Sequence, residues 1–273
     1  MELKLPETKT MKEVFNHNNV TFFLDKWECF SSEGGSQMVF VKGFLVNVNN
    51  NCKIENWIGR LLHQLSSNTE TKINYIQNEL RTLRGFYSIV IIFGSEYYII
   101  TDIIRSIPLF YGFQGNSLFI TDSLEYFQRS HSSFEIDENK LEVFFYSGMV
   151  YGRNTIYKNV YGMQAGEIVS IHDRRIKSVR YFSFIPSINV IKDKELSKYV
   201  QDYDRILISI FTRIINQNPN VNNWIVPLSG GHDSRLTISY LYRLGIKNVI
   251  CFSYGTPKNE QSVISRQLAE ILK

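Results

Sequence analysis

The chain reads SGGHDS at residues 229–234, between the apolar run WIVPL at 224–228 and a segment whose apolar residues recur at helical spacing. Strand, glycine-rich turn and helix start, in that order, are typical of a loop that binds phosphate. The glycines at 230 and 231 let backbone N–H groups approach an anion closely, and the helix N-terminus adds partial positive charge. The competing interpretation is a plain turn with an Asp or Ser helix cap. Six residues in this context favour nucleotide binding.

The side chains of this loop suit a complex of phosphate and magnesium. Ser229 and Ser234 can donate hydroxyl hydrogen bonds to phosphate oxygens. Asp233 would repel a phosphate, but a carboxylate beside phosphates is a typical Mg²⁺ ligand. The loop differs from the Walker sequence, which requires a lysine at a fixed spacing. It resembles instead the pyrophosphate loop of ATP pyrophosphatases, which cleave ATP between the α- and β-phosphates.

The segments around the loop alternate between helix and strand. An amphipathic helix is predicted at 194–217, a strand at 224–228, a helix at 234–244, a strand at 248–254 and a helix at 260–272. This alternation is typical of parallel βαβ units and a doubly wound sheet. Two parallel strands cannot bury both faces of a sheet. We therefore expect the rest of a longer protein, a homodimer or another completing chain to finish this domain.

The first part of the chain is dominated by short runs rich in aromatic and β-branched residues. Strands are expected at 21–24, 38–48, 85–93, 97–102, 109–113, 117–121, 167–171 and 178–182, with helices at 54–65, 73–83 and 139–146. Two groups of strands with few helices predict an α+β domain of stacked antiparallel sheets. Residues 1–19 are polar and are expected to form a loose arm. The predicted division is thus an arm at 1–19, an α+β domain at 20–190 and part of an α/β parallel-sheet domain at 191–273.

Composition restricts the class of protein. The chain has 273 residues, of which 44% are hydrophobic and 21% charged, as in a globular protein of about two domains. A net charge of +4 is too small to indicate nucleic acid or an anionic membrane as a partner. The cysteines Cys29, Cys52 and Cys251 lack metal or redox spacing, and no signal sequence or membrane span is evident. These features predict a cytoplasmic protein with reduced thiols.

Several short motifs resemble the asparagine synthetase family in sequence and in order, over residues 37–273. They are LRGFYSI at 83–89, DIIRSIPLFY at 102–111, LFITDSL at 118–124, TIY at 155–157, AGEI at 165–168, VPLSGGHDS at 226–234 and FSYG at 252–255. The resemblance implies an Ntn-hydrolase-like glutaminase domain followed by an ATP-pyrophosphatase domain. Sheet packing explains the aromatic residues of the earlier motifs equally well, so those motifs indicate fold rather than chemistry.

Two departures from the family pattern concern the glutaminase chemistry. Glutamine-using members carry a nucleophilic cysteine at the mature N-terminus, where the free α-amino group serves as the base. Here position 2 is Glu2, and the first cysteine is Cys29, with no sign of a processing site before it. The family's Asn-Gly-Glu substrate loop aligns with Lys42-Gly43-Phe44, which removes the amide and the carboxylate that would hold glutamine. The resemblance therefore implies a glutaminase-like domain that is inactive.

What the resemblance implies for the whole protein is an AMP-forming ligase. A substrate carboxylate would attack the α-phosphorus of ATP and release pyrophosphate, and ammonia or an amine would then displace AMP to form an amide. Family members without the glutaminase activity, such as β-lactam synthetase and lasso-peptide cyclases, use such nitrogen donors. The implied ATP site comprises Leu228, Ser229, Gly230, Gly231, Asp233, Ser234 and Tyr254, with Mg²⁺ on Asp233. Core packing is an equal alternative for Leu228.

Two other functions stay open. Enzymes that modify tRNA or form NAD or GMP share the pyrophosphate loop, but they lack a β-rich leading domain with the Asp102 to Leu109 motif. A protein that binds a nucleotide or a partner without catalysis is the other alternative. The identity of the acid, of the nitrogen donor and of the catalytic residues does not follow from the sequence.

Overall fold

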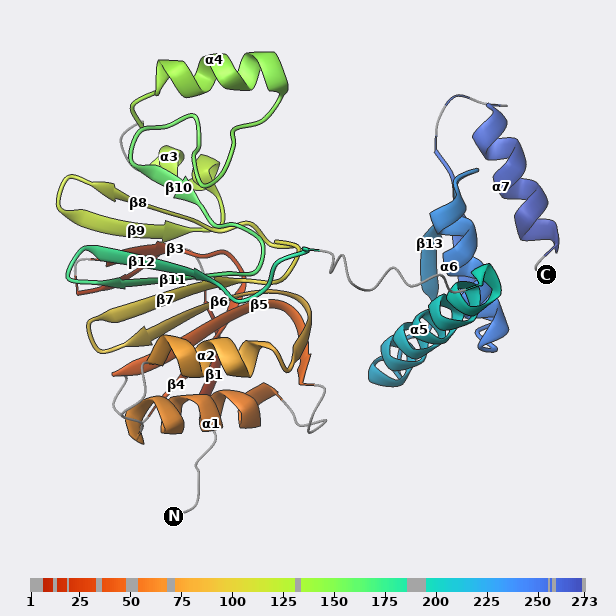
Figure 1. Ribbon diagram of the computed structural model, residues 1–273, viewed down its shortest axis with the longest axis horizontal. Helices are drawn as coiled ribbons and strands as arrows, with labels where there is room; N and C mark the ends of the chain where they lie inside the picture. Colours follow the sequence, from red (N-terminus) through yellow and green to blue (C-terminus); the bar gives the residue numbers. More distant parts are fainter. Residues whose placement is uncertain are drawn as a thin grey trace. The chain divides into compact units, whose positions relative to one another are not determined.

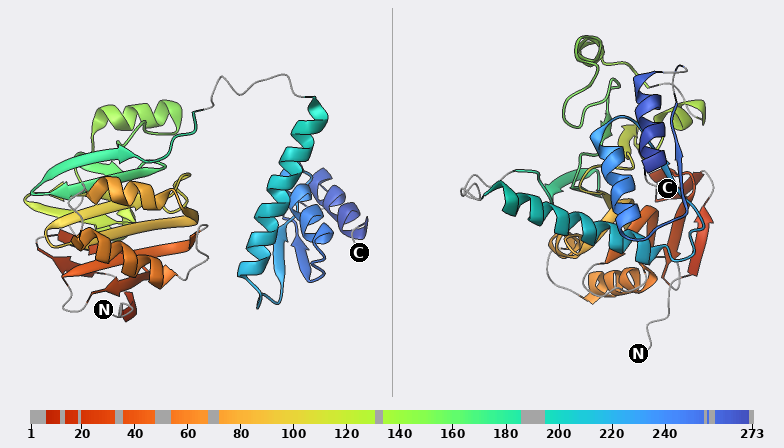
Figure 2. Two further views of the ribbon diagram at one scale, coloured as in Figure 1. Left: turned by 60° about the horizontal axis from the view of Figure 1, so that its bottom comes forward. Right: turned by 90° about the vertical axis from the view of Figure 1, so that its right-hand side faces the viewer.

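The computed structural model divides into two compact units, Met1–Ile185 and Pro186–Lys273, each with its own sheets. The structure describes residues 7–11, 14–18, 20–32, 36–47, 54–67, 72–130, 134–185, 195–254, 256 and 259–271. Figures 1 and 2 show the elements of each unit.

The first unit contains two sheets. A seven-stranded sheet has the order β1-β4-β5-β6-β7-β11-β12, and a five-stranded sheet has the order β10-β8-β9-β3-β2. All neighbours pair antiparallel except β3 and β9, which run parallel. The strands are β1 (Glu7–Met11), β2 (Val14–His17), β3 (Val20–Phe23), β4 (Trp27–Ser31), β5 (Gln37–Asn47), β6 (Leu83–Phe93), β7 (Glu96–Thr101), β8 (Phe110–Gln114), β9 (Ser117–Thr121), β10 (Val160–Gly162), β11 (Glu167–His172) and β12 (Arg175–Arg180).

Strand β6 shows why this unit has layers. Because successive side chains of a strand point to opposite faces, Ile89 and Ile91 enter one hydrophobic cluster while Val90 and Ile92 enter another. The first cluster lies between the seven-stranded sheet and the helices α1 (Ile54–Ser67) and α2 (Lys72–Leu80). The second lies between the two sheets. The layers are thus helices, sheet and sheet (Figure 1), which confirms the predicted stacking of antiparallel sheets with few helices.

Two further helices belong to the first unit, α3 (Leu124–Ser130) and α4 (Glu138–Ser147). The Asp137 side chain caps α4 by accepting a hydrogen bond from the Lys140 N–H. The helix ends at Gly148, whose φ of 71° is the left-handed conformation that glycine adopts without strain.

The expectation of a loose arm at 1–19 is wrong for the residues that the structure describes there. Strand β1 pairs with β4, and β2 pairs with β3. Their stability comes from backbone hydrogen bonds to neighbouring strands, which leave no hydrophobic signal in a polar stretch. Strands β4 and β10 and helix α3 were not predicted either. The last predicted strand, at 178–182, is shifted, since β12 covers Arg175–Arg180.

The second unit consists of α5 (Leu196–Gln217), β13 (Trp224–Pro227), α6 (His232–Arg243), β14 (Val249–Phe252) and α7 (Glu260–Ile271). Strands β13 and β14 pair in parallel, which confirms the predicted βαβ order. Helix α5 packs on α6, where the rings of Phe211 and Tyr240 stack at 5.4 Å. None of the helices in the described ranges is long and apolar enough to cross a membrane.

The buried carboxylate of Asp102 organises the loop after β7. Its Oδ2 accepts hydrogen bonds from the N–H groups of Tyr87 at 2.9 Å and Ser106 at 3.1 Å, and its Oδ1 accepts one from Ile104 at 2.8 Å. Asp102 is only 1% exposed. The aspartate of the DIIRSIPLFY motif therefore has a structural role, as the sequence suggested for these motifs.

We predict that Asp102→Ala lowers the free energy of unfolding of the first unit by about 2–4 kcal/mol, because three N–H groups lose a charged acceptor. Urea denaturation followed by circular dichroism measures this change. Glu142→Ala, on the exposed side of α4, serves as the control and should change it by less than about 0.5 kcal/mol. Equal stability of the two variants would contradict the structural role of Asp102.

Candidate functional site

The SGGHDS loop joins the carboxyl end of β13 to the start of α6. Gly231 is the N-cap of α6, in an extended conformation with φ −73° and ψ 160°, and no side chain caps the helix. The helix therefore begins at His232, two residues before the predicted start, so Asp233 and Ser234 lie in its first turn. The arrangement brings backbone N–H groups, two hydroxyls and one carboxylate together at a helix N-terminus, as the sequence predicted.

The N–H groups of this loop already have partners within the unit. Ser229 N donates to Ser234 Oγ at 3.1 Å, and Gly231 N donates to Ser229 Oγ at 3.2 Å. Gly230 N donates to the side-chain oxygen of Gln261 at 2.6 Å. A phosphate would therefore have to replace these oxygens. The serine hydroxyls can turn away by rotation, whereas Gln261 has to move its whole side chain.

Helix α7 holds the loop at two points. Gln261 accepts from Gly230 N, and the hydroxyl of Ser265 lies 2.9 Å from the carbonyl oxygen of Leu228. The two side chains are four residues apart and thus on one face of the helix. The sequence did not indicate either residue, because no local pattern predicts a contact with a loop some thirty positions away.

The fit of magnesium and phosphate to the loop rests on its donors and on one carboxylate. Asp233 is exposed, and no described group of three or more His, Cys, Asp or Glu could hold a metal ion. One carboxylate is nevertheless compatible with Mg²⁺ when phosphates and water supply the other ligands. Arg235 adds positive charge beside the loop, since its Nε donates to Gly231 O at 3.1 Å and its guanidinium lies 3.2 Å from His232 Nδ1. The residues present therefore fit a magnesium–phosphate complex.

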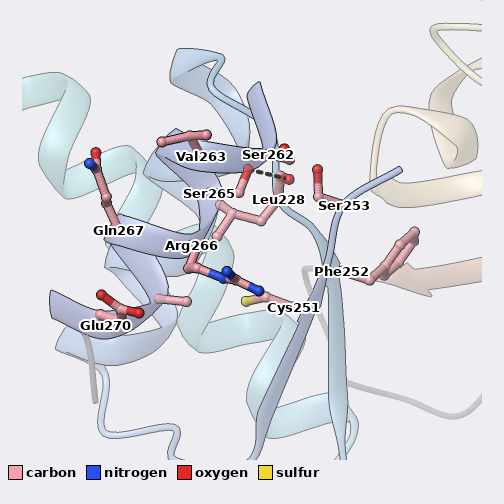
Figure 3. Close-up of a pocket in the computed structure, with 11 residues that line it drawn as sticks. Leu228, Cys251, Phe252, Ser253, Ser262, Val263, Ser265, Arg266, Gln267 and Glu270 are labelled. Atoms are coloured by element: carbon pink, nitrogen blue, oxygen red, sulfur yellow. Dashed lines mark hydrogen bonds between the residues drawn. The ribbon is translucent and has the colours of Figure 1, made fainter. Parts of the chain in front are cut away.

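A cavity of about 820 Å³ lies between β14 and α7, next to the loop (Figure 3). Leu228, Cys251, Phe252 and Ser253 line one side, and residues of α7 including Arg266 line the other. Leu228 is 2% exposed and so has a packing role as well. Tyr254 does not line this cavity and is 84% exposed. Desolvation raises the pKa of the Cys251 thiol, which keeps it protonated and unreactive.

In the first unit, Lys42 of the Lys42-Gly43-Phe44 stretch forms an internal ion pair. Its Nζ lies 2.6 Å from Asp122 Oδ2 and 2.8 Å from the carbonyl oxygen of Asp25. The indole N–H of Trp27 donates to the same Asp122 oxygen at 2.9 Å. The Asp122 side chain is 7% exposed. Lys42 thus connects three segments of the unit.

The neighbouring glycines allow two strands to approach closely. Gly43 and Gly85 have φ of 106° and 132°, and a Cβ on either would lie 2.0 Å from a carbonyl oxygen of the opposite strand. Between them, Phe44 and Phe86 face each other in the register of β5 and β6, and both side chains are exposed. The stretch therefore presents an exposed aromatic pair beside Lys42.

Of the cysteines in the first part of the chain, the structure describes Cys29. Cys29 is buried in β4, at 8% exposure, and has hydrogen-bonding or other contacts. Glu2 and Cys52, and Gly255 of the FSYG motif, lie outside the described residues.

Comparisons with known proteins concern mainly the first unit. Residues 48–182 match the family model of a glutamine amidotransferase domain. This confirms the predicted glutaminase-like domain at the level of an amidotransferase domain, whereas asparagine synthetase as the specific family stays a prediction. No curated protein matches the chain.

Two solved structures similar to the chain are amidotransferase and purine-biosynthesis enzymes. Glutamine phosphoribosylpyrophosphate amidotransferase from B. subtilis, complexed with ADP and GMP, is 19% identical, with 57% of this chain and 32% of that chain covered and a TM-score of 0.35. An allosteric regulatory enzyme of purine biosynthesis is 15% identical, with 88% of this chain and 50% of that chain covered and a TM-score of 0.34. The chain spans half or less of the length of these proteins.

We predict that Lys42→Met destabilises the first unit by about 1–3 kcal/mol, because the nearly buried carboxylate of Asp122 loses its cation. Denaturation monitored by tryptophan fluorescence measures the change, since Trp27 contacts the same carboxylate. Lys177→Met on the exposed edge strand β12 is the control. The double variant Lys42→Met with Asp122→Asn should recover part of the loss, and equal stability of Lys42→Met and the control would refute the role of this pair.

Proposed function

We propose that this protein takes part in ATP-dependent, AMP-forming amide synthesis of the asparagine synthetase type, and that its amidotransferase-like first unit does not hydrolyse glutamine. The observation that carries the proposal is the SGGHDS loop at the end of β13, where N–H groups, hydroxyls and a carboxylate gather at the N-terminus of α6. The family match supports the amide-nitrogen chemistry in a coarser form, since glutamine amidotransferase domains serve amide-nitrogen transfer.

In the proposed reaction the loop binds the pyrophosphate portion of ATP. The N–H groups of Ser229, Gly230 and Gly231 and the Ser234 hydroxyl donate to phosphate oxygens, and Asp233 holds Mg²⁺. The bound ion would neutralise phosphate charge. As a substrate carboxylate attacks the α-phosphorus, negative charge grows on the departing pyrophosphate, where fixed donors and the helix N-terminus stabilise it. Leu228 and Tyr254 are proposed to flank the adenine.

The nitrogen in this proposal comes from free ammonia or from an amine. Lys42 is engaged with Asp122, and the positions beside it carry glycine and phenylalanine, so this stretch offers no amide or carboxylate to hold glutamine. The carboxylate substrate and the nitrogen donor are small molecules in this proposal.

A binding assay tests the nucleotide site without knowledge of the acid. We expect the chain to bind a non-hydrolysable MgATP analogue, and Asp233→Ala to weaken binding about 10- to 100-fold, because the metal-bound phosphates lose a ligand. Isothermal titration calorimetry with excess Mg²⁺ measures the affinity. Asp202→Ala on α5 is the matched control, since it removes an aspartate from an exposed ion pair. Unchanged affinity in Asp233→Ala would show that Asp233 is not the Mg²⁺ ligand.

The inactive glutaminase is tested separately. Purified protein incubated with glutamine should release no ammonia above the rate of a blank, because Lys42-Gly43-Phe44 offers no amide or carboxylate to hold glutamine. Ammonia is measured by a coupled dehydrogenase assay. Release above background that disappears in Cys29→Ala would show that Cys29 is a nucleophile, and release that persists would show another one; either result overturns this part of the proposal.

A non-catalytic nucleotide-binding protein is the second candidate. It is favoured by the internal partners of all three loop N–H groups, which leave the loop stable without a ligand. Binding of MgATP with no release of pyrophosphate across a panel of carboxylic acids and amines would support it over the ligase.

A further inference from the structure

Among the three loop N–H groups, only that of Gly230 is bound by a residue outside the loop and the first turn of α6. The Gln261 Oε1 atom accepts this hydrogen bond at 2.6 Å, across 31 positions of sequence. Ser229 N and Gly231 N are bound by hydroxyls of the loop itself. The central N–H of the loop is thus controlled by α7.

The position of Gln261 is fixed by its helix. Asn259 caps α7, with its Oδ1 accepting from Ser262 N at 2.8 Å, so Gln261 lies in the first turn. One turn later, Ser265 is 5% exposed and contacts the carbonyl oxygen of Leu228. A Cβ at position 230 would lie 2.7 Å from Gln261 Oε1, so a larger residue there would require the Gln261 side chain to shift. The glutamine oxygen therefore sits close to the loop backbone in a defined place.

We propose that Gln261 is a displaceable gate of the phosphate loop: its amide oxygen holds the Gly230 N–H until a phosphate oxygen of the ligand replaces it. This proposal rests on the proposed nucleotide site and adds a regulating residue to it. Two oxygen acceptors cannot both occupy one N–H at full strength, so the glutamine competes with the ligand and lowers its affinity. Displacement also frees the first turn of α7, a helix that lines the adjacent cavity. Ligand binding at the loop is thereby coupled to α7.

Substitutions at position 261 distinguish a gate, which competes with the ligand, from a clamp, which only holds the loop in place. A methionine has a similar shape but accepts hydrogen bonds only weakly, so it frees the N–H while preserving packing. A glutamate accepts more strongly from the N–H and repels phosphate. A gate predicts opposite changes in ligand affinity for these two variants, whereas a clamp predicts loss of stability in methionine and no gain in affinity.

The test measures the binding of magnesium pyrophosphate and of a non-hydrolysable MgATP analogue to the whole chain by calorimetry. We expect Gln261→Met to bind both ligands about 5- to 10-fold more tightly, as the loss of one competing hydrogen bond implies. Gln261→Glu should bind at least about 10-fold more weakly. Gln201→Met, which changes an exposed glutamine of α5, is the control and should behave as the parent protein. Thermal unfolding of each variant shows that the fold is retained.

A second readout is hydrogen exchange of the backbone amides in the first turn of α7. Ligand should accelerate this exchange in the parent protein and change it little in Gln261→Met, where the contact is already absent. Equal affinities of the parent and Gln261→Met, or weaker binding by Gln261→Met, would overturn the gate while the nucleotide site stands. Absence of binding by every variant would overturn the nucleotide site itself, and the gate with it.

Discussion

The burial of β6 on both of its faces is the constraint on which the first unit depends. Six consecutive residues, Tyr87–Ile92, are buried. The apolar ones divide between a cluster beneath two helices, which takes Tyr87, Ile89 and Ile91, and a cluster between two sheets, which takes Val90 and Ile92. A strand in this position has to be apolar on both sides, so its neighbours β5 and β7 must be long enough to pair along it. The layers on either side then position every other element of the unit.

This packing explains how a fold persists while its chemistry changes. Gly43 and Gly85 are required by the close approach of β5 and β6, since each faces a carbonyl oxygen of the other strand. The residues beside them carry no such backbone constraint. Lys42 has entered a buried ion pair with Asp122, and Phe44 presents an aromatic ring to solvent. An amidotransferase-like scaffold is therefore compatible with the proposed lack of glutaminase activity, because the backbone constraint and the side chains beside it involve different residues.

The second unit places its polar groups by a different principle. A strand that ends beside a helix start gathers N–H groups at one point, and such groups need acceptors whether or not a ligand is bound. Here Ser234, Ser229 and Gln261 provide them. A ligand bound at this loop as proposed would have to displace these internal acceptors, so its affinity would depend on the side chains that hold the loop as well as on the loop itself.

The sequence by itself determined the periodic features: the strands of the first unit with strong apolar alternation, every helix except α3, the βαβ order and the loop at 229–234. Those follow from local patterns, because side-chain period and glycine conformation act within a few residues. Tertiary structure alone decided the pairing of polar β1 and β2, the ion pair of Lys42 with Asp122 and the contact of Gln261 with Gly230. Each joins residues by backbone or polar hydrogen bonds between segments that the chain brings together only on folding, and such bonds leave no periodic signal in the sequence.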